Sequence, residues 1–351
     1  MVDAIQLIHF TSLKSMNMNL SFKTILGMAL LFITVQATAQ QKEEKTEKKR
    51  YEHFKERNIS KTYSASGNTL NINNSFGNVT VTTWDRNEIK VDIHIEASST
   101  DKELADKMFE NIDVTESKDG SEIKFKTTTS KNKSSNYNCK NCKSSMSINY
   151  TVQIPSNNTL KIENSFGAIK LPDYNGSVSL SSKFGSLTAG NLPKTEKLLV
   201  EFGKATLKNV NNSTSTFKFS TVTIENLTGS NKINMEFCNS SRINIDNDLT
   251  SLTLNESYST VNLRPASNFS ATYTIKTSFG SVVDRTNANI KRTDTPDKYG
   301  PDSNRSYEGK SGSGSSKIEV KSSFGRIIIG EATEAEMKEK EKNKTKNKQV
   351  I

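Results

Sequence analysis

The stretch Leu70-Asn-Ile72-Asn-Asn-Ser-Phe76-Gly77-Asn-Val79-Thr-Val81 recurs as Leu160-Lys-Ile162-Glu-Asn-Ser-Phe166-Gly167-Ala-Ile169-Lys-Leu171. Both copies carry two alternating apolar residues before an aromatic–glycine pair and two after it. The pair recurs along the chain, and in three copies another residue replaces the glycine. The members are Phe76-Gly77, Phe166-Gly167, Phe184-Gly185, Phe202-Gly203, Phe279-Gly280 and Phe324-Gly325, with Phe219, Phe237 and Tyr258 in the degenerate copies.

The spacing of these aromatic residues is nearly constant. From Phe166 to Phe279 the steps are 18, 18, 17, 18, 21 and 21 residues. A fixed period of about 20 residues is typical of stacked repeats, because a unit of that size must pack on its neighbours to bury its apolar side. The sequence therefore predicts an all-β chain built as a single-stranded β-solenoid, or β-helix, with coils of 18 to 21 residues.

The phase of the apolar residues predicts the shape of each coil. Leu160 and Ile162 share the parity of Phe166, which indicates a strand with one buried side. Ile169 and Leu171 have the opposite parity. We expect the glycine to take a positive φ and make a bend, and the aromatic rings to form a ladder in the core. Single glycines followed by strands do not have the spacing of a phosphate-binding loop.

Composition and charge agree with an exported repeat protein. The chain has 351 residues, a net charge of +10 and only 33% hydrophobic residues, which a solenoid tolerates because only alternate strand residues face inward. Nucleic-acid binding is not expected, because the basic residues are not interleaved with aromatic residues and the chain looks exported.

Residues 1–39 have the pattern of a signal peptide. Lys23 precedes an apolar run over 25–35, and Ala37-Thr-Ala39 provides small residues for cleavage. The run is too short to span a membrane, and no later stretch could span one as a helix. Met16 and Met18 are alternative starts. We expect export to the periplasm, to the outer membrane or to the cell surface and medium.

The remaining sequence divides by composition. Residues 40–60 are a leader rich in Lys and Glu, and 61–330 are the predicted solenoid domain. Residues 82–159 interrupt the repeat as an inserted α+β segment. Residues 285–316 read as a flexible loop, and 331–351 as a disordered tail rich in Lys and Glu. Between the loop and the tail, the last copy of the repeat is expected to be the terminal coil.

The inserted segment contains sequence patterns that predict strands, a helix and a disulfide of its own. Alternating residues predict strands over 89–95, 123–128 and 147–154, and Thr100-Asp-Lys-Glu103 is a capping box that opens a helix to about residue 112. Cys139 and Cys142 are expected to form a local disulfide in an exported chain, because a zinc site would need two further ligands.

We found no convergent chemistry and expect no catalytic, cofactor-binding or metal site. His9 lies in the signal peptide, His53 in the leader, and His94 on the polar side of a strand, outside any cluster of ligands. Asp246-Asn-Asp248 is a polar turn without the glycine and glutamate of a calcium loop. Trp84 is compatible with sugar stacking, but packing against the inserted segment is the favoured interpretation.

The phrase Asn74-Ser-Phe-Gly-Asn-Val-Thr-Val81, followed by Trp84-Asp85-Arg86, resembles a bacterial family of putative adhesins, as do Tyr150-Thr-Val-Gln-Ile-Pro155 and the later Ser-Phe-Gly coils. This family is a domain of unknown function with Phe-Gly β-strand repeats, similar to head-domain adhesins. The resemblance covers roughly residues 60–330. It implies a right-handed solenoid and supplies no catalytic residues.

These observations predict a non-catalytic, exported cell-envelope protein, an adhesin or scaffold that presents a solenoid surface. Its ligand would be an envelope or extracellular protein or glycan. Two alternatives stay open: a periplasmic accessory or sensor partner of an envelope regulatory system, and a polysaccharide-active β-helix enzyme whose carboxylates meet across adjacent coils. Self-association through the exposed strand edges at the solenoid ends is a further expectation.

Overall fold

The computed structural model describes residues 50–129, 139, 141–296 and 302–337. The predicted signal peptide lies outside these residues, as do the first part of the leader, the middle of the predicted loop and most of the predicted tail. The described residues confirm an all-β chain, with one short helix and one further helical turn at residues 334–337. The helix α2 spans Lys102–Glu110. The strands are β1 (His53–Ser64), β2 (Thr69–Ser75), β3 (Val79–Thr83), β4 (Glu88–Ser99), β5 (Ile112–Asp119), β6 (Glu122–Thr129), β7 (Ser144–Ile154), β8 (Leu160–Ser165), β9 (Ala168–Leu171), β10 (Val178–Lys183), β11 (Ser186–Leu192), β12 (Thr195–Glu201), β13 (Lys204–Asn211), β14 (Thr214–Lys218), β15 (Thr221–Glu236), β16 (Ser241–Ser257), β17 (Thr260–Pro265), β18 (Ala271–Ser278), β19 (Ser281–Asp284), β20 (Lys291–Arg292), β21 (Asn304–Ser311), β22 (Ser316–Ser323) and β23 (Arg326–Ile329).

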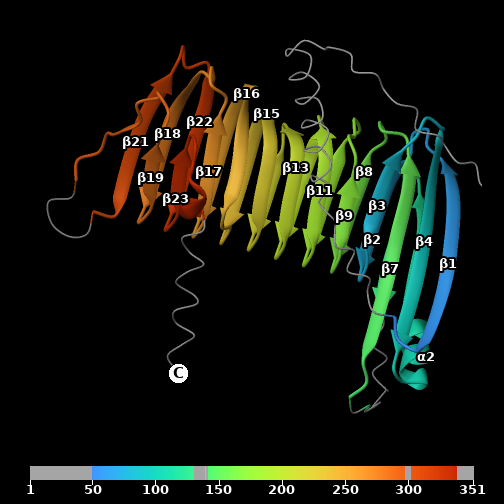
Figure 1. Cartoon of the computed structure of the whole chain (residues 1–351). Helices are drawn as coiled ribbons and strands as arrows, with labels where there is room; N and C mark the ends of the chain where they lie inside the picture. The colour runs from blue at the N-terminus through green and yellow to red at the C-terminus, as the bar shows by residue number, and fades with distance from the viewer. Residues whose placement is uncertain (1–49, 130–138, 140, 297–301, 338–351) are drawn as a thin grey trace, which may run out of the picture. The chain divides into compact units, whose positions relative to one another are not determined.

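The repeat copies pair strand by strand in two ladders (Figure 1). The strands that come before a corner aromatic residue form hydrogen-bonded pairs with one another. The strands that come after a corner aromatic residue do the same. Between repeat copies that neighbour one another in the stack the pairs are parallel, with register shifts only in the β10–β12 and β15–β16 pairs. Leu70, for example, lies opposite Leu160, which lies opposite Val178. The first ladder runs β5, β6, β2, β8, β10, β12, β14, β15, β16, β22, β18, β21. The second runs β1, β4, β7, β3, β9, β11, β13, β15, β16, β17, β23, β19.

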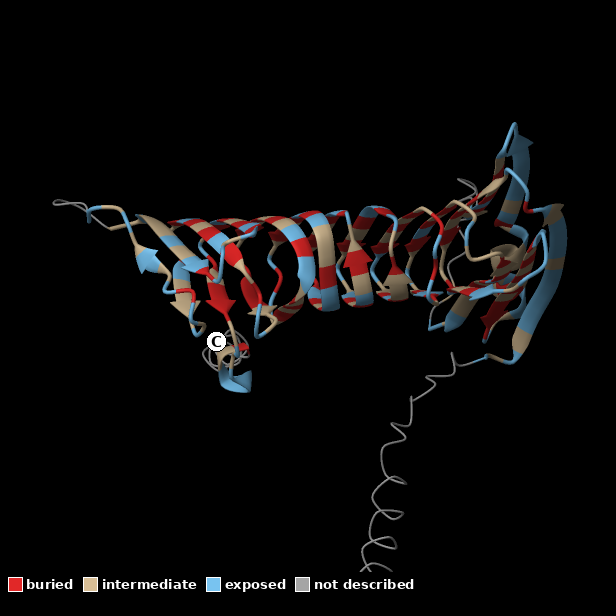
Figure 2. Cartoon of the chain, turned by 90° about the horizontal axis from the view of Figure 1, so that it is seen from above, coloured by how far each residue is buried: buried red, intermediate tan, exposed pale blue. Residues whose placement is uncertain are grey.

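Alternate strand residues form the core between the ladders. Leu160 and Ile162 before the corner and Ile169 after it are fully buried, and their strand neighbours Lys161, Glu163 and Lys170 are partly or fully exposed. Figure 2 shows the same alternation of buried and exposed residues along the strands. This is the burial that the change of parity predicted from sequence.

The last copy of the repeat is not a terminal coil, which corrects the sequence prediction. Strand β22 pairs with β16 on one side and with β18 on the other, and β23 lies between β17 and β19. Residues 316–329 therefore occupy a position between two copies that precede them in the chain, as Figure 1 shows. The equal lengths and apolar patterns of these coils allow either order.

Two segments predicted to be irregular contain strands. Strand β1 pairs with β4 over all of its length, although residues 53–60 had been assigned to a solvated leader. Ile59 and Tyr63 pack against the core, and Lys61 between them is exposed, as is usual for a charged residue on an edge strand. Within the predicted loop, β21 pairs with β18 in antiparallel orientation.

The inserted segment continues both ladders. Strand β6 pairs with β2, and β7 pairs with β3. Helix α2 begins one residue later than the capping box suggested, because the carboxylate of Asp101 accepts a hydrogen bond from Leu104 N at 2.8 Å. The helix ends at Glu110, and Ile112 is buried at the start of β5, a strand that the sequence did not predict.

Candidate binding surface at the aromatic corner

The aromatic residue, and not the glycine, takes the left-handed backbone conformation at each corner. The nine aromatic residues have φ between 49° and 65°, whereas the glycine that follows each of six has no positive φ. Glycine is needed for a different reason. A Cβ atom at Gly167, Gly185 or Gly203 would lie 1.9 to 2.0 Å from the carbonyl oxygen of the corner glycine one coil earlier. The sequence prediction of a glycine bend is corrected accordingly.

The rings lie outside the core, which corrects the prediction of a core ladder. Eight of the nine are 44–58% exposed, and Phe76 is half-buried. By strand alternation each aromatic would face inward like the residue two positions before it. The left-handed backbone turns the ring outward instead, because it breaks the alternation at that residue.

Other side chains fill the core beside the corner. Asn164, two residues before Phe166, is buried, and its Nδ2 donates to Gly77 O at 3.0 Å. Asn74 Nδ2 donates to Asn164 Oδ1 at 3.0 Å. Asn74 Nδ2 also donates to Ile148 O at 3.0 Å, so each asparagine of the Asn-Ser-Phe-Gly phrase gives a main-chain carbonyl of the neighbouring coil a hydrogen bond inside the core.

The rings form one continuous stack along the corner. Neighbouring centroids are 4.7 to 5.0 Å apart and neighbouring planes differ by 3° to 7°. The order is Phe76, Phe166, Phe184, Phe202, Phe219, Phe237, Tyr258, Phe324 and Phe279, which follows the order of the strands. We call this stack the aromatic ladder. Its spacing is that of paired strands, and its end rings lie about 39 Å apart along the centroids.

The geometry determines which part of the rings a ligand could touch. The faces of the inner rings are covered by their neighbours, so the exposed area consists of ring edges. Sugar stacking needs a free ring face and is limited to the two end rings. The inner edges offer a narrow apolar strip to apolar groups of a partner.

Charges beside the aromatic ladder alternate in sign. Lys183, Glu201, Lys218 and Glu236 each precede a ring, and the pairs Lys183–Glu201 and Lys218–Glu236 have N···O distances of 2.9 Å. These pairs cancel locally. The residues that directly precede the rings therefore carry no net charge that would favour an ionic ligand.

One carboxylate lies inside the core beside the ladder. Glu256 is buried and accepts hydrogen bonds from Ser322 Oγ and from Ser259 N, the latter at 3.2 Å. A Cβ atom at Gly325 would collide with this carboxylate, so glycine is required there as well. Sequence reasoning missed this group, although Glu256 occupies the same position two residues before the aromatic as the buried Asn74 and Asn164.

Two clusters of potential metal ligands occur in the described part of the chain. His94 lies next to Glu56 and Glu96, which corrects its assignment outside any cluster. Arg50 pairs with both carboxylates, at 2.7 and 3.6 Å, so the cluster is explained by ion pairing. The other cluster joins Asp101 to the two cysteines discussed next.

The cysteines fall into two classes. Cys139 and Cys142 are bonded to each other, with Cα atoms 5.6 Å apart. Cys238 is a buried free thiol at the position of a corner glycine. Burial raises the pKa of the Cys238 thiol to about 11, so it is protonated at neutral pH.

Within the described residues, no helix has the length and apolar character required to cross a bilayer. No protein-family model matches the chain, and no curated protein matches it.

Three solved structures are similar to the chain at low identity. A putative cell adhesion protein from Clostridium sporogenes is 15% identical, covers 79% of this chain and 100% of its own, and has a TM-score of 0.25. A putative adhesin from Bacteroides fragilis is 12% identical over 78% of this chain and 97% of its own, with a TM-score of 0.28. A putative lipid binding protein from Parabacteroides distasonis is 12% identical over 80% and 98%, with a TM-score of 0.32. At these TM-scores the likeness carries no argument about fold or function.

Proposed function

We propose that this chain is a non-catalytic, exported protein of the cell envelope, an adhesin or scaffold whose β-solenoid presents a regular surface for binding. The observation that carries the proposal is the aromatic ladder. Eight of its rings are about half exposed in one unbroken row. Continuous exposed apolar area is uncommon on soluble proteins and is typical of interaction surfaces.

The proposal includes a right-handed, single-stranded solenoid. Its support is the pairing of each strand with its equivalent one coil away in two parallel ladders. Parallel strands of one sheet are almost always joined by right-handed connections. Pairing between equivalent residues of neighbouring coils places the corners on one line, and the aromatic ladder follows that line.

The rings have a structural role that does not require their edges to be apolar. Stacking of the faces stabilises neighbouring coils by about 0.5–1.5 kcal/mol per pair. Tyr258 shows that a hydroxylated ring fits the same stack, because its centroids lie 4.9 Å from those of Phe237 and Phe324. The use of phenylalanine at the other eight positions therefore supports a role for the edges in binding.

The test separates the edges from the faces. The triple variant Phe184→Tyr, Phe202→Tyr and Phe219→Tyr should keep the stack and add a hydroxyl to each outer edge. Beads coated with residues 40–351, wild type or variant, are compared for adherence to immobilised fibronectin, collagen, mucin and whole bacterial envelopes. We expect the wild type to adhere to at least one of these surfaces and the variant to lose most of that adherence.

Equal adherence of wild type and variant would remove the aromatic ladder from the proposal. Absence of adherence to every surface would contradict the binding function. The non-catalytic part has its own assay, in which the same protein is incubated with neutral and acidic polysaccharides. Release of new reducing ends would contradict it and favour a polysaccharide-active enzyme.

A further inference from the structure

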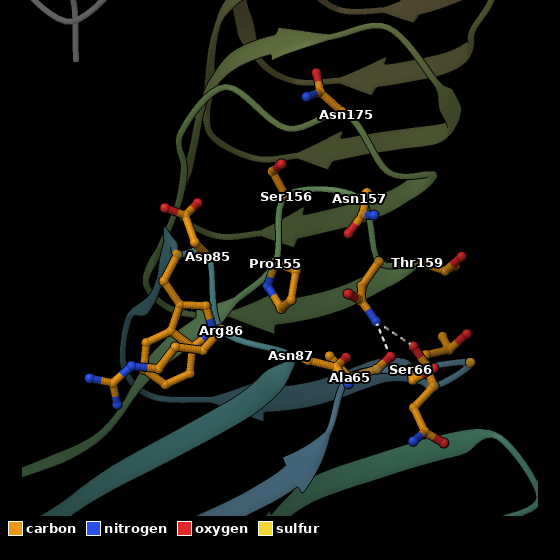
Figure 3. Close-up of a pocket in the computed structure, with 15 residues that line it drawn as sticks. Ala65, Ser66, Asp85, Arg86, Asn87, Pro155, Ser156, Asn157, Thr159 and Asn175 are labelled. Carbon is orange, nitrogen blue, oxygen red and sulfur yellow. Dashed lines mark hydrogen bonds between the residues drawn. The ribbon is translucent and has the colours of Figure 1, made fainter.

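A polar hollow of about 910 Å³ lies where four loops meet (Figure 3). The loops connect β1 to β2, β3 to β4, β7 to β8 and β9 to β10, and they contribute residues 65–69, 84–87, 155–159 and Asn175. Its volume falls in the range of about 300–1,000 Å³ that is usual for small-molecule sites. We propose that this hollow binds a neutral saccharide, a function separate from that of the aromatic ladder.

Hydrogen bonds fix the loops relative to one another. The side-chain amide Nδ2 of Asn158 donates to Ala65 O at 2.6 Å and to Asn68 O at 2.9 Å, which ties two loops together (dashed in Figure 3). Trp84 N donates to Ile154 O at 3.3 Å and links a third loop to the end of β7. The hollow is therefore formed before a ligand arrives, which lowers the entropy that binding would cost.

The walls offer hydrogen-bonding groups that no protein partner uses. In the described structure the side chains of Asp85, Asn87 and Asn157 make no hydrogen bond, and all three line the hollow. Figure 3 places Asp85 and Asn157 with Pro155 and Ser156 between them. A carboxylate accepts hydrogen bonds and an amide both donates and accepts them. Sugar hydroxyls need this combination, because each one is both a donor and an acceptor.

The hollow also contains an aromatic ring in a fixed position. Trp84 is half-buried, and its Nε1 donates to Glu88 O at 2.7 Å. The guanidinium carbon of Arg86 lies 5.1 Å from the ring centre. The guanidinium covers one face of the indole, so only the rest of the ring can provide apolar area for the C–H groups of a sugar, while the polar walls bind its hydroxyls.

Charge decides between neutral and acidic saccharides. Among the lining residues, Asp85 is the single acidic side chain and Arg86 the single basic one. The hollow thus carries no net charge, so a charged sugar would gain no net electrostatic attraction from it. This favours a neutral ligand.

The chain provides a built-in probe for this site. Trp84 is its only tryptophan, so intrinsic tryptophan fluorescence reports on this hollow alone. The purified protein is titrated with maltose, cellobiose, lactose and N,N′-diacetylchitobiose, and with glucuronic acid as the acidic comparison. We expect a saturable change with at least one neutral disaccharide, at a dissociation constant on the order of 1 mM.

Substitutions of the lining residues test whether the sugar binds in the hollow. Asp85→Ala and Asn157→Ala should each weaken binding about fivefold, the effect of one lost hydrogen bond. Asp113→Ala, an exposed carboxylate outside the hollow, should change it less than about twofold. The triple tyrosine variant of the aromatic ladder should bind the sugar like the wild type, so failure of one proposal is distinguishable from failure of the other. Circular dichroism checks that each variant is folded.

Three results would overturn the inference. The first is no saturable fluorescence change, and no saturation-transfer NMR signal, with any neutral disaccharide up to about 100 mM. The second is binding that the Asp85 and Asn157 variants leave unchanged. The third is binding of glucuronic acid alone, which would contradict the neutral ligand.

Discussion

A methyl group at Gly185 is expected to push two coils of the stack apart. The Cβ atom of Gly185→Ala would lie 1.9 Å from Gly167 O, and real Cβ atoms stay more than 3.0 Å from such an atom. One coil would have to move by about 1 Å, more than a packed interior absorbs without loss. The φ of Gly185 is not positive, so backbone strain does not complicate the result.

The expected cost follows from the contacts near this point. Overpacking costs about 1–3 kcal/mol. The movement also strains the hydrogen bond from Ser186 N to Gly167 O, 3.4 Å long, which is worth about 1 kcal/mol. It disturbs the stacked pair Phe166–Phe184, worth about 0.5–1.5 kcal/mol. We therefore expect a loss of about 2–5 kcal/mol in the free energy of unfolding.

Ser220→Ala is the matched control, because Ser220 occupies the glycine position of a later copy and already carries a Cβ atom. Its Oγ donates to Lys218 O at 2.7 Å and accepts a hydrogen bond from Gly203 N at 3.2 Å, so the substitution should cost about 1–2 kcal/mol without pushing the coils apart. Urea unfolding of residues 40–351, followed by circular dichroism, measures both variants. If Gly185→Ala lies within about 0.5 kcal/mol of the wild type, the close-approach explanation of the glycines is wrong.

Three further predictions concern the cysteines, the helix and one carboxylate. Without reductant, a thiol reagent should label no cysteine in the native protein and only Cys238 in the unfolded protein. Labelling of three cysteines in the unfolded protein would contradict the bond between Cys139 and Cys142. Asp101→Ala should cost about 0.5–2 kcal/mol in urea unfolding by removing the helix cap, and Asp101→Asn much less. A hydrogen bond from a neighbouring guanidinium lowers the pKa of Asp294 to about 2. Its stabilising contribution is therefore full above about pH 4 and lost as the pH falls towards 2. The urea midpoint of Asp294→Asn should fall less than that of the wild type over this interval, and parallel curves would refute the assignment.

The repeat period and the alternation of apolar residues were sufficient to predict the all-β class and the buried positions. They could not predict the side on which the rings lie. The parity of Phe166 matches that of buried Ile162, and only the left-handed φ at the aromatic reverses it. Such a φ is rare for a large side chain, so the sequence pointed to the glycine instead.

The order of the coils in the stack and the edge strand β1 could not be predicted from the sequence either. Residues 316–329 carry the same phrase as the coils around them, and equal patterns fit any slot in a stack of parallel strands. Strand β1 resembles a charged leader because an edge strand exposes most of its residues. The saccharide hollow depends on four loops that are up to about 110 residues apart in the chain, and only Trp84 hinted at it.

The most direct test of an exported binding surface is the accessibility of the corner itself. The variant Lys204→Cys places one cysteine at an exposed strand position next to Gly203. It is the only thiol expected to react, because the native Cys238 is buried and the other two cysteines are bonded to each other. Cells that produce this variant are treated with a maleimide that cannot cross the cytoplasmic membrane. We predict labelling while that membrane is intact. Labelling that appears only after the cytoplasmic membrane is broken would contradict export, and with it the proposed function at the cell envelope.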